Sequence, residues 1–366
     1  MIKKRLARFR REIKEKKLDG FLVSLAANRR YLSGFSPDDG QFGESSGSLL
    51  ITQAAAVILT DFRYQLSARD QAPFFETVIY PHGLALELAR LAPILGLKRL
   101  GFESEALLVL AHQRLAQELP GVELVPTEKL VVALRVEKDT SEVRDLMRAL
   151  AAMETALEQI LDEDLVGRTE RELALAVTRL SEDAGADGPA FQPIVASGPN
   201  GAEAHAEPGS RVIQAGDPVI FDVGAKLDGY CSDISRTVVA GGREQADARF
   251  REVYRIVRQA QVAALEGIRP GMTGAQADAI ARRIIEDAGY GPQFGHSLGH
   301  GVGLATHESP SVGPRSRDVL EPGMIFTVEP GIYLPGWGGV RLEQMVLLDH
   351  DGCHLLNQLD HFYDFS

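Results

Sequence analysis

The chain has 366 residues, of which 45% are hydrophobic and 25% are charged, and its formal net charge is −12. This acidic balance argues against nucleic acid as the main partner, because binding to phosphates needs a basic surface. No apolar run approaches the length that spans a bilayer, and two cysteines make no disulfide framework, so we expect a cytoplasmic protein without a membrane partner.

Residues 1–132 are predicted to form an α/β domain, which opens with an amphipathic helix. Ile2, Leu6, Phe9 and Ile13 recur at helical spacing, with charged residues between them. Short apolar runs between helical patterns predict strands: GFLVSL, GSLLIT, AAVILTD, TVIY, RLGFE and VELVP.

A second domain is predicted over residues 133–366, because Asp139 and Glu142 have the spacing of a helix start before a long helical pattern. This domain contains an internal duplication. The segment GRTERELALAVTRLSEDAGADGPAF recurs as GMTGAQADAIARRIIEDAGYGPQF, and each copy has a Thr N-cap and a terminating Gly.

Each copy is followed by a predicted hairpin that carries two acids. In VIFDVGAKLDGYCSDISRT, a turn centred on Leu227 and Asp228 would place Asp222 opposite Asp233. In the second hairpin, a turn centred on Gly336 would place Glu329 opposite Glu343. Carboxylates this close repel each other, and a cation between them would remove that penalty.

Three histidines lie among glycines between the two hairpins, in HSLGHGVGLATHE. Four carboxylates and one imidazole suit two divalent metal ions. The oxygen-rich ligand set favours Mn²⁺, with Co²⁺, Zn²⁺ and Fe²⁺ as alternatives. Such a centre could activate water and polarise a carbonyl group, so amide hydrolysis is the expected chemistry.

These motifs resemble the pita-bread metallopeptidases, which include methionine aminopeptidase, aminopeptidase P and prolidase. The resemblance lies in FDVGAKLDGYCSDISRT, GHGVGLATHE, TVEPGIY and GVRLEQ. NRRYLSGF and LTDFRY are similar to a creatinase-type N-terminal domain, so the expected fold is that α/β domain followed by a pita-bread catalytic domain. The closest resemblance is to aminopeptidase P and prolidase, which cleave Xaa-Pro bonds.

The resemblance implies a role for each residue of the site. The expected metal ligands are Asp222, Asp233, His300, Glu329 and Glu343, and Glu329 would also act as the general base. The histidines His307 and His205 would act on the substrate and its protons. The residues expected to line the proline side of the pocket are His296, Tyr333 and Arg341.

We therefore expect an Xaa-Pro aminopeptidase that acts on peptides with proline at the second position. The alternatives are an Xaa-Pro dipeptidase, a creatinase-like amidinohydrolase or a non-catalytic scaffold of the same fold. The resemblance also implies a homodimer, because relatives of this two-domain type are commonly dimers. The polar loop SPDDGQFGESSGS, residues 36–48, could narrow the cleft and hold a substrate ammonium through Asp38, Asp39 and Glu44.

Overall fold

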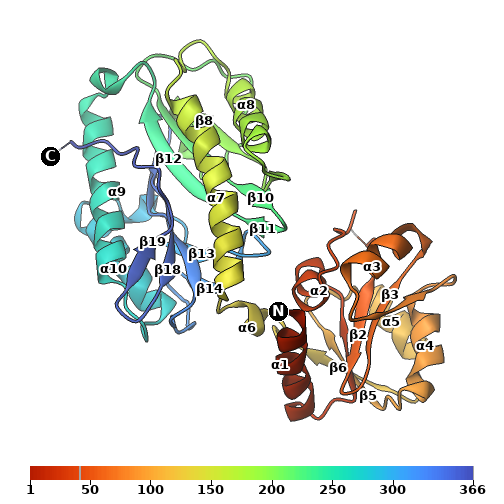
Figure 1. The fold of residues 1–366 in the computed structure, drawn as a ribbon. Helices are drawn as coiled ribbons and strands as arrows, with labels where there is room; N and C mark the ends of the chain where they lie inside the picture. The colour runs from red at the N-terminus through yellow and green to blue at the C-terminus, as the bar shows by residue number, and fades with distance from the viewer. Residues whose placement is uncertain (41–42, 366) are drawn as a thin grey trace. The chain divides into compact units, whose positions relative to one another are not determined.

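The structure is a computed structural model, and it describes residues 1–40 and 43–365. The chain forms two compact units, Met1–Arg135 and Val136–Ser366 (Figure 1). The predicted boundary after residue 132 falls inside α6, which the structure keeps with the first unit. No described helix is both long and apolar enough to cross a lipid bilayer.

The first unit is a mixed six-stranded sheet in the order β4-β3-β2-β1-β5-β6, with helices on both faces. Its elements are α1 (Ile2–Glu15), β1 (Gly20–Val23), α2 (Ala26–Ser33), β2 (Ser48–Thr52), β3 (Ala56–Thr60), η1 (Phe62–Tyr64), α3 (Gln65–Gln71), β4 (Glu76–Ile79), α4 (Leu84–Ile94), β5 (Arg99–Glu103), α5 (Val109–Glu118), β6 (Glu123–Thr127) and α6 (Val132–Arg135). All the predicted strands are present.

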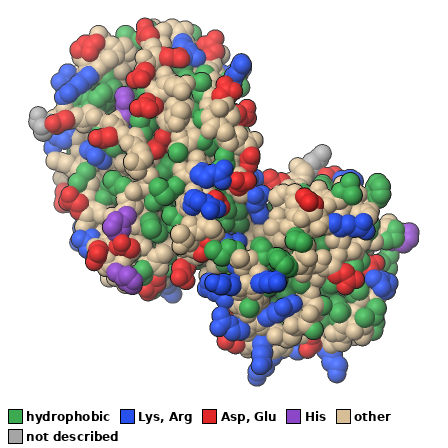
Figure 2. All heavy atoms as spheres, viewed as in Figure 1, with side chains coloured by type: hydrophobic (Ala, Val, Ile, Leu, Met, Phe, Trp, Pro, Cys, Tyr) green, Lys and Arg blue, Asp and Glu red, His purple; other side chains and the backbone are tan. Residues whose placement is uncertain are grey.

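The alternating side chains of β1 explain why both faces of this sheet are covered. Phe21 packs edge-on against Phe9 of α1, while Leu22 joins the apolar cluster of α4 and α5. Most of the basic side chains of α1 are exposed to solvent (Figure 2), whereas Arg5 and Arg10 are half-buried and donate hydrogen bonds to the backbone of Tyr31 and Thr52. The prediction of an amphipathic first helix is confirmed.

The loop over residues 36–48 is tied to its own unit through Asp39. The Asp39 carboxylate contacts the fully buried Arg29 at 2.8 Å and accepts a hydrogen bond from the Ser46 backbone. These contacts engage both of its oxygens, so Asp39 does not fit the expected role of binding an ammonium group. Residues 41–42 of the loop lie outside the described residues.

The second unit contains two similar halves, each with a helix pair packed on an antiparallel sheet (Figure 1). The elements of the first half are α7 (Thr140–Leu161), α8 (Glu170–Asp183), β7 (Gly188–Pro189), β8 (Ile194–Ser197), η2 (Gly198–Ala202), β9 (Pro218–Val223), β10 (Ala225–Leu227), β11 (Tyr230–Cys231) and β12 (Ile234–Val239). Those that follow are η3 (Arg243–Gln245), α9 (Ala248–Gly267), α10 (Gly274–Asp287), η4 (Gly291–Gln293), β13 (Gly299–Gly301), β14 (Glu308–Val312), β15 (Ile325–Val328), β16 (Gly331–Leu334), β17 (Gly338–Arg341), β18 (Gln344–Leu348) and β19 (Cys353–Leu355).

The predicted duplication extends to the helix caps. Thr169 and Thr273 each cap their helix in a capping box, with Glu172 and Gln276 as the third-position partners. The glycines that follow α8 and α10 both have positive φ, 103° and 86°. This left-handed conformation ends a helix without the steric penalty of a Cβ atom.

A C-terminal segment packs behind the hairpins through the buried Arg236. The Arg236 guanidinium donates hydrogen bonds of 2.6 Å to the carbonyl oxygens of Glu343 and Leu359. It also lies 4.4 Å from the centre of the Phe362 ring, in a cation–π contact. Residues near the end of the described chain therefore help to hold the second hairpin.

Candidate metal centre and active-site pocket

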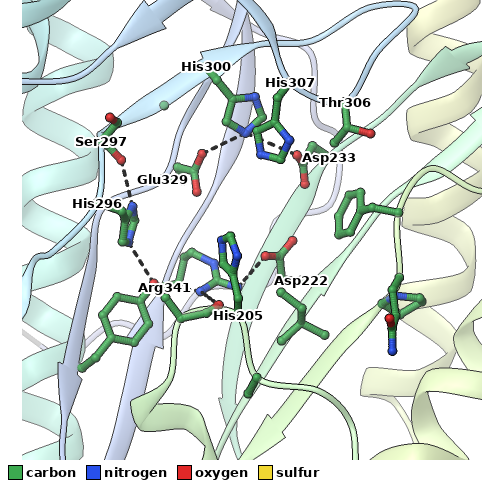
Figure 3. Close-up of a pocket in the computed structure, with 18 of the residues that line it drawn as sticks. His205, Asp222, Asp233, His296, Ser297, His300, Thr306, His307, Glu329 and Arg341 are labelled. Atoms are coloured by element: carbon green, nitrogen blue, oxygen red, sulfur yellow. Dashed lines mark hydrogen bonds and ion pairs between the residues drawn. The ribbon is translucent and has the colours of Figure 1, made fainter. Parts of the chain in front are cut away.

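Four carboxylates lie near the ends of four strands at the centre of the second unit, and Figure 3 shows three of them. Asp222 is the penultimate residue of β9, and Asp233 immediately precedes β12. Glu329 immediately follows β15, and Glu343 immediately precedes β18. The two halves therefore place their acids at similar points of their hairpins.

The predicted register of the first hairpin is wrong by two residues, because Asp222 pairs with Ser235 rather than with Asp233. The cause is the turn. Its central residues are Asp228 and Gly229, with φ of 48° and 76°, one position later than expected. A shift by an even number of residues keeps both acids on one face, so they still face the same site.

The predicted register of the second hairpin is confirmed. Glu329 lies opposite Glu343, because the pairs on either side of them keep the expected alignment. These pairs are Val328 with Gln344 and Gly331 with Arg341.

Asp233 and Glu343 are the two inner acids, and both are buried. Burial raises the pKa of Asp233 well above its ordinary value, and the negative charges of Glu343 and Asp222 add to the effect. Burial and the charge of Glu329 raise the pKa of Glu343 in the same way. One Glu343 oxygen accepts a hydrogen bond from Ser235, while the other, Oε1, has no partner among the described residues.

Asp222 and Glu329 are the two outer acids, and each has a basic partner. Asp222 lies 2.5 Å from Arg341 Nη2. Glu329 accepts hydrogen bonds from Thr327 Oγ1 at 2.9 Å and from His300 Nε2 at 3.2 Å. Burial alone would raise the pKa of Glu329, but the hydrogen bond and charge of His300 lower it to about 2.

The donor atoms of this centre fit a divalent cation. One ligand atom from each of Asp233, His300 and Glu343 can lie within 4.8 Å of the others. Oxygen and imidazole donors suit divalent first-row metals. A cation here would also satisfy the unpaired Glu343 oxygen and offset the repulsion between buried acids.

The centre opens into a pocket of about 520 Å³. All the predicted site residues except Glu343 line this pocket, and they are Asp222, Asp233, His300, Glu329, His307, His205, His296, Tyr333 and Arg341. The structure thus brings together residues that lie more than a hundred positions apart in the sequence.

On one side of the pocket, three of these residues form a hydrogen-bonded chain (Figure 3). Arg341 Nη1 donates to the Tyr333 hydroxyl at 2.8 Å, which leaves that hydroxyl to donate to His296 Nε2 at 2.9 Å. His296 Nδ1 then donates to the Ser297 carbonyl oxygen at 2.8 Å. Arg341 also donates to Ser235, so these polar groups mainly bind one another rather than facing the pocket unpaired.

Two further histidines reach the pocket from loops. The His307 ring centre lies 4.1 Å from that of His300, and burial lowers the pKa of His307, with the charge of His300 adding to the effect. His205 lies on the loop after η2 and is exposed. The buried Glu170 anchors that loop by accepting hydrogen bonds from the Ser197 backbone and the Gly209 backbone.

The sequence reasoning missed several pocket residues, although one signal for them was present. Phe191 and Phe294 are equivalent positions of the duplication. Phe191 lines the pocket, and Phe294 packs edge-on against His296 at 5.1 Å. A neighbouring cavity of about 420 Å³ shares His296 with the main pocket, and Arg315 lines it. No motif marks Arg315 in the sequence.

Comparison with known proteins identifies the family. Residues 144–350 match metallopeptidase family M24, and residues 5–136 match the creatinase/prolidase N-terminal domain. An uncharacterised peptidase of Bacillus subtilis is 38% identical over 335 residues, which are 92% of each chain. An Xaa-Pro dipeptidase of Pyrococcus horikoshii is 35% identical over 346 residues, which are 94% of this chain and 93% of that one.

Solved structures agree over almost the whole length. An Xaa-Pro dipeptidase from Bacillus anthracis superposes with a TM-score of 0.92 at 37% identity, covering 98% of both chains. An X-Pro aminopeptidase from Thermotoga maritima gives a TM-score of 0.89 at 32% identity, covering 97% of both. The chain belongs to metallopeptidase family M24 and joins a pita-bread catalytic domain to a creatinase-type N-terminal domain.

Proposed function

We propose that this protein is an Xaa-Pro dipeptidase that works with two divalent metal ions. The observation that carries the proposal is that relatives named Xaa-Pro dipeptidase match nearly the whole chain in both sequence and structure. These relatives favour a dipeptidase over the aminopeptidase that the sequence motifs alone put first.

The proposed ligands are the four acids and one histidine of the centre. Ligand atoms of Asp233, Glu343 and His300 lie within 4.8 Å of one another, and Asp222 and Glu329 are proposed to complete the set. We propose Mn²⁺ as the ion, because most of the donors are carboxylate oxygens. When bound, the metals supply an acidified water and polarise the scissile carbonyl group.

The protein side chains would handle the protons and the substrate. Glu329 is the proposed general base, since it is an outer acid that lines the pocket. His307 is proposed to stabilise the developing oxyanion at the scissile bond, because it also lines the pocket and its ring lies beside that of the proposed ligand His300. His205, on the exposed loop, is proposed to move protons between the site and solvent.

A dipeptide substrate carries a free carboxylate one residue beyond the scissile bond, and Arg315 is the proposed cation for it. Arg315 is exposed, lines the cavity next to the pocket and donates no hydrogen bond to another described residue. Arg282 lines the same cavity but is bound to Asp278 at 2.6 Å. A guanidinium suits carboxylate recognition because it can donate two parallel hydrogen bonds.

The experiment is to incubate metal-loaded protein with Ala-Pro, Ala-Pro-Ala and Ala-Ala-Ala. A dipeptidase hydrolyses Ala-Pro and leaves both tripeptides intact. Release of alanine from Ala-Pro-Ala would support the second candidate, an aminopeptidase, which the similarity to the Thermotoga maritima enzyme favours. Hydrolysis of none of the three would contradict both.

Arg315 can be tested with a matched control on the same segment. Arg315→Met should raise KM for Ala-Pro by about tenfold or more, because a charged partner of the carboxylate is lost. Arg317 is also exposed but lines neither cavity, so Arg317→Met should leave KM unchanged. Equal KM values for the two variants would remove Arg315 from the proposal.

A further inference from the structure

A buried ion pair lies behind the loop that carries His307. Lys138 Nζ is 2.7 Å from Glu308 Oε1, and the two side chains are only 1% and 5% exposed. Lys138 lies just before α7, whereas Glu308 is the first residue of β14. The pair therefore joins two points of the second unit that are 170 residues apart.

The loop before Glu308 is shaped around its carboxylate. The second carboxylate oxygen faces the Ala305 backbone nitrogen at 3.4 Å, and the Gly303 nitrogen donates to the Ala305 carbonyl oxygen at 3.0 Å. A Cβ atom at Gly303 would lie 2.4 Å from Glu308 Oε1, so the glycine leaves room for the carboxylate. His307, the next residue back from Glu308, points into the pocket (Figure 3).

Lys138 is itself fixed by the backbone around it. Its ammonium group also donates to the Val136 carbonyl oxygen at 3.2 Å, and its backbone nitrogen donates to the Gly323 carbonyl oxygen at 2.8 Å. A cation held this way gives the Glu308 carboxylate one defined position. Because the carboxylate is nearly inaccessible to water, removing this cation would leave its buried negative charge less well compensated.

We propose that Lys138 and Glu308 are positioning residues that fix the His307 loop for catalysis. The inference rests on the proposed function, because it takes His307 to act on the reacting carbonyl group. Without the pair, the carboxylate would move toward water and carry the loop with it. A displacement of about 1 Å at a catalytic group can cost roughly 100-fold in rate.

The test is a double-mutant cycle between Lys138→Met and His307→Ala, with kcat measured on Ala-Pro. Lys138→Met should lower kcat by roughly 10- to 100-fold, with KM within about twofold. In the His307→Ala background it should cause no further loss, because the residue that it positions is absent. Losses that multiply in the double variant would overturn the proposal.

Three variants guard against a purely structural explanation. Arg148 of α7 forms an exposed ion pair with Asp228 at 2.9 Å, so Arg148→Met is the matched control and should keep normal kcat. Lys138→Arg keeps the charge and should recover most of the activity. If Lys138→Met does not fold, the double variant Lys138→Met/Glu308→Gln removes both charges of the pair and should fold with the same loss of kcat. Normal kcat in the double variant would contradict the inference.

Hydrogen exchange gives a readout that needs no substrate. In Lys138→Met, a peptide covering residues 301–308 should exchange its amides faster than in the wild-type protein, and in Arg148→Met it should not. Unchanged exchange in Lys138→Met would overturn the positioning role whatever the activity. Amide exchange could rise in Lys138→Met while the wild-type protein hydrolyses no Xaa-Pro peptide. That result would contradict the proposed function but would support the role of the Lys138–Glu308 pair in fixing the His307 loop.

Discussion

The two halves of the catalytic unit are alike in their acids and unlike in their bases. Each half contributes one outer acid that lines the pocket and one inner acid that precedes a buried strand. The second half, however, supplies the basic partners of both outer acids. Arg341 reaches across to Asp222 of the first half, and His300 binds Glu329 of its own half.

The histidines follow the same division. His296, His300 and His307 come from the second half, and only His205 comes from the first. The duplication therefore accounts for a roughly symmetric cradle of carboxylates, which suits a pair of cations. The groups proposed to act on the substrate belong mostly to the second half, whereas the proposed metal ligands come from both halves.

Removing the metals should have the largest effect on activity, because both halves contribute carboxylates to the proposed metal centre. We expect a chelator to abolish peptidase activity and Mn²⁺ or Co²⁺ to restore it. Thermal stability should fall as well, since a ligand at 100 times its Kd stabilises by about 2.7 kcal/mol. Activity, melting temperature and metal content should be measured together, and an active protein without divalent ions would disprove the prediction.

Glu329→Gln should come next in size. Glutamine keeps the shape of the side chain but cannot take a proton from water, so kcat should fall by about 10²–10⁴-fold with a smaller change in KM. Metal content must be measured, because Glu329 is also a proposed ligand. Near-normal turnover with full metal would show that another group is the base.

The histidines of the two halves allow a direct comparison. His307→Ala should lower kcat by about 10²–10³-fold, the range for loss of an oxyanion donor. His205→Ala should lower it less, because this exposed residue is proposed only to move protons. Both variants should retain two metals by elemental analysis. Loss of metal from either one would show that the ligand assignment is wrong.

The smallest effects should be two changes of opposite sign in the free energy of unfolding of the metal-free protein. Asp233→Asn removes a buried charge that lies among other acids, so it should stabilise that form by about 1–3 kcal/mol. Asp222→Asn should destabilise it by a similar amount, because the buried Arg341 loses a charged partner. Urea unfolding of the metal-free variants measures both, and equal signs would show that inner and outer acids do not differ.

Local patterns were sufficient to predict much of the fold. Apolar runs predicted the strands of the first unit, and the Thr caps predicted equivalent helices in the second, because these signals act within a few residues. The positions of the four acids in two hairpins also predicted that they lie together at one site. The first register was wrong because one step in the position of a two-residue turn changes every pair after it.

Long-range pairing could not be predicted from such patterns. Nothing near Arg341 indicates that its guanidinium binds Asp222, and nothing near Lys138 indicates Glu308 as its partner. These pairs exist because burial removes the alternative of water, and burial is decided by the packing of the whole unit. Sequence motifs predicted which residues lie together at the site, but only the structure identified their hydrogen-bond partners.

The contact between Arg236 and the C-terminal segment also bears on the order of events during synthesis. Domains generally fold as units as they leave the ribosome, the N-terminal one first. The first unit can follow that course. In the second unit, Arg236 binds the carbonyl oxygen of Glu343, but its contacts with Leu359 and Phe362 form only once those residues are available. The catalytic unit should therefore complete its fold only after residues 359–362 have been made.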